Sequence, residues 1–328
     1  MAQVAPAFMD LETSLARAEE AIAGAAGDGA RLVVFPEAWL PGYPVWADAG
    51  IPWEDRATKQ AFGRLHRNSV EVPGPATEVL RRAARRHRVH VVMGINEREA
   101  RYSRGTLYNS ILFLSDAGEI LGVHRKLVPT HSERVIWGQG DGSALLVLDT
   151  AVGRLGGLVC WEHWMPLARF AMHAEGEQVH AALWPDLPEM HQVASRAYAF
   201  EGRTFVLSAG MFLPLDAIPE DLEVADAIRA AAATRPDHTL LFDGGSGVIG
   251  PDGEWVAGPV RGEETIVLAE IDLDRIAEEM SSLDAAGHYN RPDVFRLEVD
   301  RGSRVPLVVR GDPERGPQNS PRADGNGS

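Results

Sequence analysis

RLGGLVCWEHWMP, residues 154–166, joins an apolar run of strand length to the only cysteine of the chain. The run at residues 155–159 predicts a buried strand, and Cys160 follows it directly. In α/β proteins ligand sites form at the carboxyl ends of strands, so a thiol in this place is a candidate for chemistry. A lone cysteine that ends a strand is more often a small core side chain. The rest of the sequence has to decide between these two interpretations.

Helical and strand patterns alternate on both sides of this stretch. Apolar residues at helical spacing predict helices at residues 11–22, behind a capping Asp10, and at residues 76–84 and 190–202. Apolar runs predict strands at residues 31–35, 89–95, 155–159, 179–183 and 204–209. Turn signals at residues 116–118 and 251–253 predict two hairpins. Together they indicate an α/β domain with mixed sheets and helices outside.

The organisation of the chain favours one domain followed by a short extension. There is no internal repeat and no Ser/Gly-rich linker, so we predict a single domain over residues 1–300. Residues 301–328 are predicted to be a C-terminal extension. From about residue 311 it contains Gly, Pro, Asn, Asp and Arg with almost nothing apolar, so its ordering entropy is not offset and we expect disorder.

Composition excludes several classes of partner. The 328 residues carry 32 Lys and Arg against 47 Asp and Glu, a formal net charge of -15, which disfavours nucleic acid and anionic membranes. No window reaches the roughly 18 apolar residues of a membrane helix, and the N-terminus has no signal-like pattern. We therefore expect a cytoplasmic protein that binds neither nucleic acid nor membrane. Its single cysteine cannot form a disulfide within the chain.

Polar residues follow three of the apolar runs at the point where each run stops. Glu37 comes after LVVFP, Lys126 after ILGVHR and Cys160 after RLGGLV. A thiol attacks as thiolate, and its ordinary pKa of about 8.5 leaves a minority ionised at neutral pH, so a neighbouring base such as Glu37 would activate it. Lys126 would stabilise charge that develops on a substrate nitrogen. A glutamate or lysine after a strand is otherwise usually solvated.

Other constellations explain less of the sequence. Four residues could be drawn together as metal ligands, namely His131, Glu133, Glu162 and His163, but no HExxH pair or similar ligand spacing is present. A thiol-protease arrangement has no local signature here. GGSGVIG at residues 244–250 lacks the lysine of a phosphate loop and predicts a turn entering a strand. We therefore predict neither a metal nor a cofactor.

Three motifs surround the strand-end residues and resemble those of the nitrilase superfamily of carbon-nitrogen hydrolases. They are FPEAWLPGYP at 35–44, HRKLVPTHSERVIWGQGDG at 124–142 and GGLVCWEHWMP at 156–166, and the resemblance extends from about residue 2 to residue 297. It implies an α-β-β-α sandwich of two mixed β-sheets flanked by helices. The family begins with a strand upstream of the match near Gln3, so either the first strand is short or translation starts before Met1.

The resemblance also implies roles for individual residues. Glu37 would be the general base, Lys126 the stabiliser of the tetrahedral intermediate and Cys160 the nucleophile. Glu133 matches a second glutamate that the family places beside the lysine, and we expect it to position Lys126 or water. Nitrilase-like chains associate into dimers and spiral oligomers, so self-association is expected as well.

CWEHWMP at residues 160–166 resembles the nitrilase branch in particular. This implies hydrolysis of a nitrile to the carboxylic acid and ammonia, through a thioimidate and an acyl thioester on Cys160. An amidase or carbamoyl hydrolase, a cyanide-hydrolysing enzyme, and a catalytically silent assembly protein remain alternatives. Three aromatic residues near the cysteine are candidates for substrate binding, namely Trp161, His163 and Trp184. Trp184 ends the strand after Cys160, where an indole either walls an apolar pocket or packs in the core.

Overall fold

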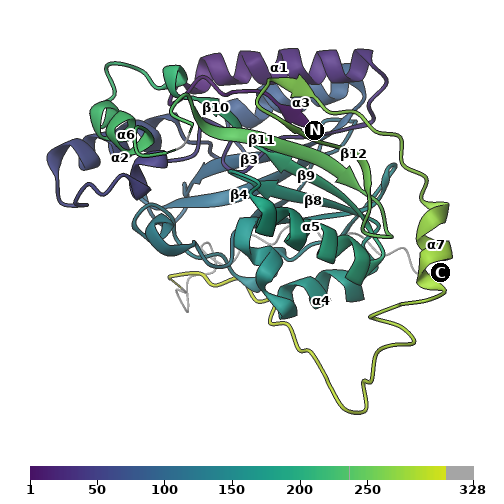
Figure 1. Cartoon of the computed structure of the whole chain (residues 1–328). Helices are drawn as coiled ribbons and strands as arrows, with labels where there is room; N and C mark the ends of the chain where they lie inside the picture. Colours follow the sequence, from purple (N-terminus) through teal and green to yellow (C-terminus); the bar gives the residue numbers. More distant parts are fainter. Residues whose placement is uncertain (236, 308–328) are drawn as a thin grey trace.

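The computed structural model describes residues 1–235 and 237–307 (Figure 1). Its helices are α1 (Leu11–Gly27), α2 (Arg56–Asn68), α3 (Pro75–His87), α4 (Pro166–Ala174), α5 (Glu189–Gly202), α6 (Ala225–Ala232) and α7 (Asp274–Met280). Its strands are β1 (Ala2–Gln3), β2 (Leu32–Val34), β3 (His90–Arg98), β4 (Leu107–Leu114), β5 (Ile120–Arg125), β6 (Leu148–Thr150), β7 (Gly153–Val159), β8 (Val179–Trp184), β9 (Phe205–Gly210), β10 (Phe212–Pro214), β11 (Leu240–Ile249), β12 (Trp255–Arg261) and β13 (Thr265–Ile266). Two short 3-10 helices matter for the site, η2 (His131–Val135) and η4 (Cys160–Trp164).

Two mixed sheets form the centre of the molecule. The first has four strands in the order β2-β3-β4-β5, of which only β2 and β3 run parallel. The second has seven strands in the order β10-β11-β9-β8-β7-β6, with β12 added to β11. Its central strands β7, β8 and β9 are parallel, so their carboxyl ends meet at one edge. Cys160 follows β7 at that edge.

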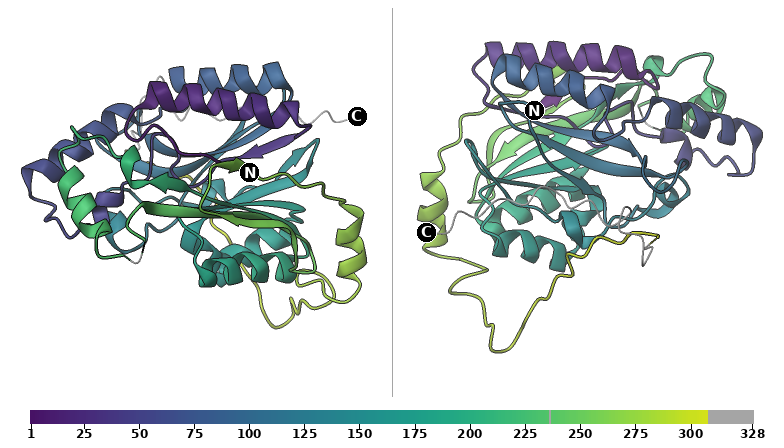
Figure 2. Two further views of the ribbon diagram at one scale, coloured as in Figure 1. Left: turned by 45° about the horizontal axis from the view of Figure 1, so that its top comes forward. Right: turned by 180° about the vertical axis from the view of Figure 1, so that it is seen from behind.

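Helices cover the outer face of each sheet, as the views in Figures 1 and 2 show. Helices α1 and α3 pack on the four-stranded sheet, where buried residues such as Ile22 and Leu80 meet Val91. The inner faces of the sheets pack on each other through residues such as Phe113 and Leu158. Helices α4 and α5 cover the outer face of the seven-stranded sheet. The predicted α-β-β-α sandwich of two mixed sheets is confirmed.

Most elements predicted from sequence are present within two or three residues of their predicted ends. The hairpins are β4–β5 and β11–β12, and residues 244–250 belong to strand β11 rather than to a phosphate loop. The first strand, β1, has only two residues and pairs with β13. The predicted disorder from residue 311 lies outside the described residues. No helix in the described ranges is long and apolar enough to cross a membrane.

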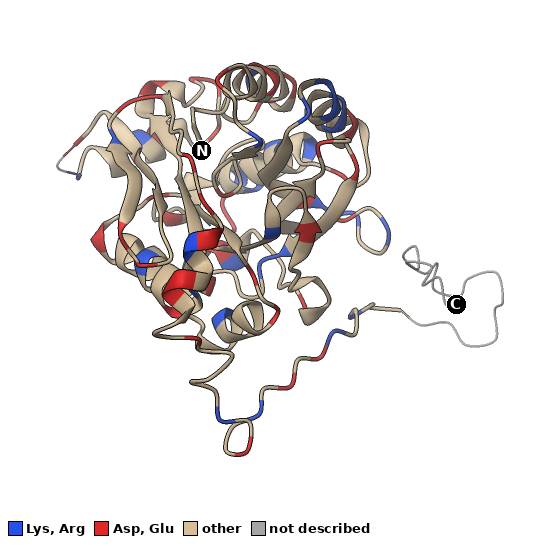
Figure 3. Cartoon of the chain, turned by 90° about the vertical axis from the view of Figure 1, so that its right-hand side faces the viewer, with Lys and Arg blue, Asp and Glu red and all other residues tan. Residues whose placement is uncertain are grey.

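A long segment without helix or strand follows α7, loops away from the body of the molecule and returns to it beneath α4 (Figure 1). Acidic and basic residues are interspersed along it (Figure 3). Part of it lies against α4, where Arg301 pairs with Glu175. Residues 290–301 and α4 enclose a surface cavity of about 370 Å³ between them.

Candidate active site

Glu37 is held by a loop that crosses strand β3 immediately after β2. The loop passes directly over Gly94, where an added Cβ would overlap Pro36 O and lie 2.7 Å from Ala38 N. Ala38 has a φ of 48°, in the left-handed region that non-glycine residues rarely adopt. Because glycine has no side chain, position 94 leaves room for the strained loop. The loop directs the Glu37 carboxylate inward, where the side chain is fully buried.

Asn96, also on β3, fixes the continuation of this loop. Its side-chain amide nitrogen donates to the carbonyls of Ala38, Leu40 and Gly42, at 3.3, 3.1 and 3.1 Å. Its amide oxygen accepts from Trp137 Nε1 at 2.9 Å. One buried side chain thus supplies the hydrogen bonds that a loop beside a sheet would otherwise lack.

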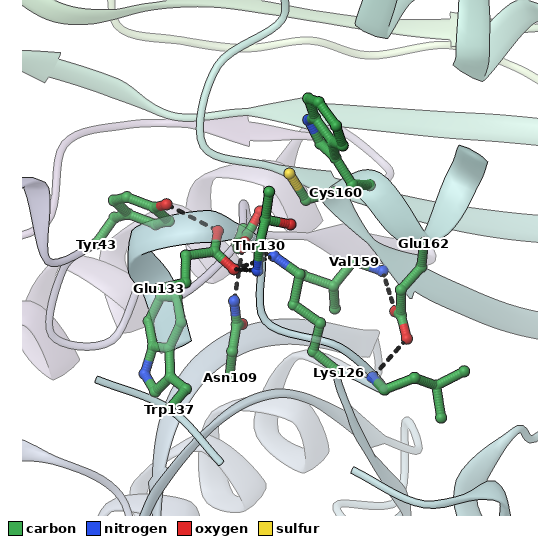
Figure 4. A network of polar contacts seen from close by, with 12 residues as sticks. Tyr43, Asn109, Lys126, Thr130, Glu133, Trp137, Val159, Cys160 and Glu162 are labelled. Carbon is green, nitrogen blue, oxygen red and sulfur yellow. Dashed lines mark hydrogen bonds and ion pairs between the residues drawn. The ribbon is translucent and has the colours of Figure 1, made fainter. Parts of the chain in front are cut away.

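Lys126 follows β5, and its ammonium lies between two carboxylates (Figure 4). Its Nζ donates to Glu37 Oε1 at 3.0 Å and to Glu133 Oε2 at 2.7 Å, and its side chain is fully buried. Asn109 Nδ2 adds a third contact, donating to Glu37 Oε1 at 2.6 Å. The Oε1 atom of Glu37 is therefore occupied by two donors.

Glu133 lies in the first turn of η2 and is fixed from both sides. The main-chain N–H of Thr130 donates to its Oε2 at 2.7 Å, and the hydroxyl of Tyr43 donates to its Oε1 at 2.8 Å. Together with Lys126 these contacts satisfy both carboxylate oxygens. Glu133 is thus held rigidly beside the ammonium.

Cys160 begins η4 with a φ of 52°, a second strained position at the end of a strand. Glu162, two residues later, braces this turn: it accepts from Val159 N at 2.7 Å, as Figure 4 shows, and from Leu127 N at 2.8 Å. Its carboxylate also contacts His124 Nε2 at 2.9 Å. One carboxylate therefore binds the residue before Cys160 to the residue after Lys126, and so joins the two sheets.

The structure brings together all four residues that sequence placed at one site. One carboxylate oxygen of Glu37, one of Glu133 and the thiol sulfur of Cys160 all lie within 4.8 Å of one another. Among the described residues this is the one group of acidic, histidine and cysteine side chains close enough to hold a metal ion. The ammonium of Lys126 already donates to both carboxylates and supplies the positive charge that a cation would bring. His131, Glu162 and His163 do not belong to such a group.

Burial and neighbouring charge shift the pKa values of these groups. Burial raises the pKa of the Cys160 thiol well above its usual value, and the Glu37 charge adds to this effect. Burial also raises the pKa of Glu37 to about 7, although Lys126 opposes it. Burial lowers the pKa of Lys126, but the charges of Glu37, Cys160 and Glu133 outweigh burial and hold it above the usual value. Cys160 is therefore a neutral thiol beside a carboxyl group whose pKa is close to 7.

One atom of Glu37 is free to exchange a proton. Within the described part of the chain, its Oε2 atom is buried and has no hydrogen-bond partner, while Oε1 holds Lys126 and Asn109. The amide oxygen of Asn109 is also buried without a partner. Buried oxygens without partners are costly and uncommon, and they concentrate at functional sites. The arrangement can accept a proton at Oε2 while Oε1 stays anchored.

The three aromatic residues predicted to bind substrate lie in different surroundings. Trp161 is 52% exposed, and its indole N–H donates to His191 Nε2 at 3.2 Å. Trp184 is fully buried and stacks between His163 and His191. Both ring nitrogens of His163 are engaged, by Cys160 O and by His180. His163 consequently has no nitrogen left for a substrate.

Sequence reasoning missed the polar partners that hold the site. Tyr43, Asn109 and Glu162 position Glu133, Glu37 and the Cys160 turn, but they occur in ordinary strand or loop contexts. Glu162 alone carried a signal, since an acidic residue two positions after the candidate cysteine lies within reach of the same turn. For Tyr43 and Asn109 the contact depends on tertiary pairing.

Comparisons with known proteins agree with this fold. The family described as carbon-nitrogen hydrolase matches residues 1–279. Nitrilase 2 from an unknown prokaryotic organism is 42% identical over 94% of both chains. Bifunctional nitrilase/nitrile hydratase NIT4A of Nicotiana tabacum is 39% identical over 90% of this chain and 84% of its own. A carbon-nitrogen hydrolase from Helicobacter pylori G27 superposes with a TM-score of 0.67 at 20% identity, over 89% of this chain and 94% of its own.

The α-β-β-α sandwich and these matches define a hydrolase that acts on carbon-nitrogen bonds. The chain belongs to the carbon-nitrogen hydrolase family. The relatives that match it at about 40% identity over most of their length carry the name nitrilase.

Proposed function

We propose that the protein is a nitrilase, which converts an organic nitrile to the carboxylic acid and ammonia with Cys160 as nucleophile. The observation that carries the proposal is the convergence of the Cys160 thiol with the Glu37 and Glu133 carboxylates, within 4.8 Å, around the Lys126 ammonium. The names of the similar proteins, which include nitrilase and nitrile hydratase, support a nitrile as the substrate.

Glu37 is the general base in this proposal. Its free Oε2 takes the thiol proton as Cys160 Sγ bonds to the nitrile carbon, and the proton passes to the nitrile nitrogen to give a thioimidate. A base with a pKa near 7 is suited to both steps, because it accepts and returns protons at neutral pH. The raised pKa of the thiol makes such a base necessary.

Two waters complete the reaction. The first loses a proton to Glu37 as its oxygen bonds to the thioimidate carbon, and Glu37 passes this proton to the nitrogen. The remaining hydroxyl proton follows as the carbonyl forms, and the carbon-nitrogen bond breaks to release ammonia. The acyl thioester that remains is attacked by the second water in the same manner. The carbon-sulfur bond breaks, the carboxylic acid leaves and Cys160 regains its proton.

Lys126 stabilises the negative charge that develops on the substrate during each addition. An ammonium that is fixed and shielded from water stabilises such charge more than a solvated one would. Glu133 holds this ammonium in place, and Tyr43 and Thr130 in turn hold Glu133. The protein thus supplies positioned charge, and the thiol supplies the covalent step.

The test is to incubate the enzyme with a panel of nitriles and their matching amides and to measure acid, ammonia and amide. We expect acid and ammonia from nitriles and no ammonia from the folded Cys160→Ala variant. Acid from amides alone would replace the proposal with an amidase or carbamoyl hydrolase. Turnover of inorganic cyanide alone would make the protein a cyanide hydrolase. No turnover by a folded parent protein would favour an assembly role.

We propose in addition that the chain self-associates through its outer helices. Helices α4 and α5 and the end of η4 expose large apolar side chains, from 37% to 68%, at Trp164, Leu167, Met190, Val193 and Phe200. Such clustered apolar exposure favours a protein interface. Sedimentation of the parent and of a Leu167→Glu/Phe200→Glu variant tests it, because a monomeric variant is expected.

A cytoplasmic location is proposed as well, because a single free thiol suits that reducing compartment.

A further inference from the structure

A chain of buried hydrogen bonds starts at the main-chain carbonyl of Cys160 and leads into the core. His163 Nδ1 contacts Cys160 O at 2.7 Å, and His163 Nε2 contacts His180 Nε2 at 2.9 Å. His180 Nδ1 contacts Glu177 Oε1 at 2.8 Å, and the Tyr198 hydroxyl donates to Glu177 Oε2 at 2.6 Å. All four side chains are buried. The reaction proposed above uses none of them.

Only one arrangement of protons satisfies every contact with neutral groups. A carbonyl can only accept, so His163 must carry its proton on Nδ1, and its Nε2 must accept. His180 then donates from Nε2 and accepts at Nδ1. Glu177 is left as the donor to His180, which requires a protonated carboxyl group. Tyr198 donates to the other Glu177 oxygen, and the chain is complete.

The surroundings favour these neutral forms. Burial raises the pKa of Glu177 to about 8 and lowers the pKa of His180 to about 3. Burial likewise holds the pKa of His163 well below its usual value. At neutral pH these three groups are therefore uncharged, and each hydrogen bond takes the direction described above.

The fold makes room for these hydrogen-bonded side chains beside β7, the strand that precedes Cys160. An added Cβ at Gly156, on β7, would overlap Glu177 Oε1 and lie 2.6 Å from Met172 Cε. Trp184 stacks on the His163 ring with centroids 4.7 Å apart, and Arg169 donates to His163 O at 3.0 Å. The ring of His163 is consequently fixed in orientation as well as in tautomer.

Cys160 needs such a support because of its backbone. With a φ of 52° it lies in the left-handed region, which non-glycine residues rarely adopt because their Cβ is crowded there. The direction of its carbonyl and the direction of its thiol are linked through this strained backbone. A donor that holds the carbonyl therefore also holds the sulfur in its place near Glu37.

We propose that His163 is a positioning residue that fixes the Cys160 turn by donating to its carbonyl, and that His180, Glu177 and Tyr198 hold His163 in the required tautomer. The inference rests on the proposed role of Cys160 as nucleophile. Histidine rings that orient a reactive group are commonly set by the hydrogen bond to their other nitrogen.

Two substitutions at His163 separate its two nitrogens. The side-chain nitrogen of asparagine can occupy the place of Nδ1, and that of glutamine the place of Nε2. His163→Asn keeps the donor to Cys160 O, so we expect kcat within about threefold of the parent. His163→Gln loses that donor, and because a small misplacement of a reacting group costs about 10²-fold, we expect a comparable loss of kcat with KM nearly unchanged. Equal losses in both variants would overturn the inference.

Glu177 tests the far end of the chain without touching the site. Glu177→Gln keeps an N–H donor for His180 and an oxygen for Tyr198, so we expect activity close to that of the parent. Glu177→Met removes both, and we expect a loss of kcat similar to that of His163→Gln. If Glu177→Gln lowers kcat as much as Glu177→Met, the proposal that Glu177 is protonated is wrong. If neither variant lowers kcat, the hydrogen bonds from His163 to Tyr198 have no positioning role.

The rate of Cys160 alkylation by iodoacetamide supplies a readout that needs no nitrile. We expect it to change in His163→Gln and Glu177→Met relative to the parent, and to stay near the parent rate in His163→Asn and Glu177→Gln. The melting temperature of each variant is measured alongside, to establish that it is folded. A parent that hydrolyses no nitrile would contradict the proposed function, whereas identical alkylation rates in all folded variants would contradict the positioning role.

Discussion

Replacing Lys126 by methionine would leave two buried carboxylates without their counter-charge. The substitution keeps a side chain of similar length and removes only the ammonium, which lies 3.0 Å from Glu37 Oε1 and 2.7 Å from Glu133 Oε2. The Glu37 and Lys126 side chains are fully buried and that of Glu133 is 4% exposed, so water cannot replace the lost contacts.

The cost to the free energy of unfolding follows from this burial. Removing one partner of a buried ion pair typically costs about 3–5 kcal/mol. Arg64→Met is the matched control, because it breaks a pair with Asp221 whose side chain is 78% exposed, and such pairs contribute about 1 kcal/mol or less. Urea unfolding followed by circular dichroism at pH 7.5 measures both variants. A Lys126→Met variant no less stable than Arg64→Met would refute the argument.

The same argument predicts how the deficit depends on pH. Burial already raises the pKa of Glu37 to about 7 in the folded protein, above its usual value of 4.5, and loss of Lys126 raises it further. A carboxyl group of this kind stabilises the fold below its unfolded pKa, and the contribution is lost as pH rises through the folded pKa. Below about pH 7 Glu37 is protonated in both folded proteins, so its part of the Lys126→Met deficit should appear only above that pH and should grow until the pH passes the higher pKa of the variant. A Lys126→Met/Glu133→Gln variant, with one charge fewer, should recover part of the loss at pH 7.5, and no recovery would count against the electrostatic explanation.

Three further results are expected. The kcat/KM of the parent should fall as pH decreases below about 7, because Glu37 must be ionised to act as base, and a flat profile from pH 5 to 8 would exclude that role. Gly94→Ala should lower unfolding stability by about 1–3 kcal/mol or more in urea titrations, since its Cβ meets the Glu37 loop; the control Gly24→Ala, in open space on α1, should raise stability by up to about 1 kcal/mol. Glu162→Gln should lower the free energy of unfolding by about 1–3 kcal/mol and remove most of kcat, because one amide oxygen cannot accept from both Val159 N and Leu127 N in their present positions. The control Glu175→Gln, whose side chain is 42% exposed, should change neither quantity.

Local patterns were sufficient to predict the elements with long, regular apolar spacing. Helices α1 and α5 and strands β3, β4 and β8 were predicted because propensity, periodicity and turn residues agree there. Helix α2 was missed, because only Thr58, Ala61 and Leu65 of its side chains are buried and most of its surface is charged. Helix α4 was missed because its start, Pro166, lies inside the motif around Cys160.

The meeting of the strand ends could be anticipated, but its geometry could not. Glu37, Lys126 and Cys160 each follow a strand, so one site was a reasonable prediction, although two residues come from one sheet and the third from the other. No local pattern states how two sheets are stacked. His163 shows the limit at shorter range: spacing placed it near Cys160, but the tight turn of η4 directs its ring into the core rather than toward a substrate.

The brace made by Glu162 ties the geometry of the site to the alignment of the two layers. Its carboxylate spans from Val159 on the seven-stranded sheet to Leu127 beside the four-stranded sheet. Any slip of one sheet along the other would separate the proposed base from the proposed nucleophile while both sheets stayed intact. Heating should therefore abolish turnover at temperatures where the secondary structure still persists. Loss of activity would then mark the separation of the two sheets, before the fold itself is lost.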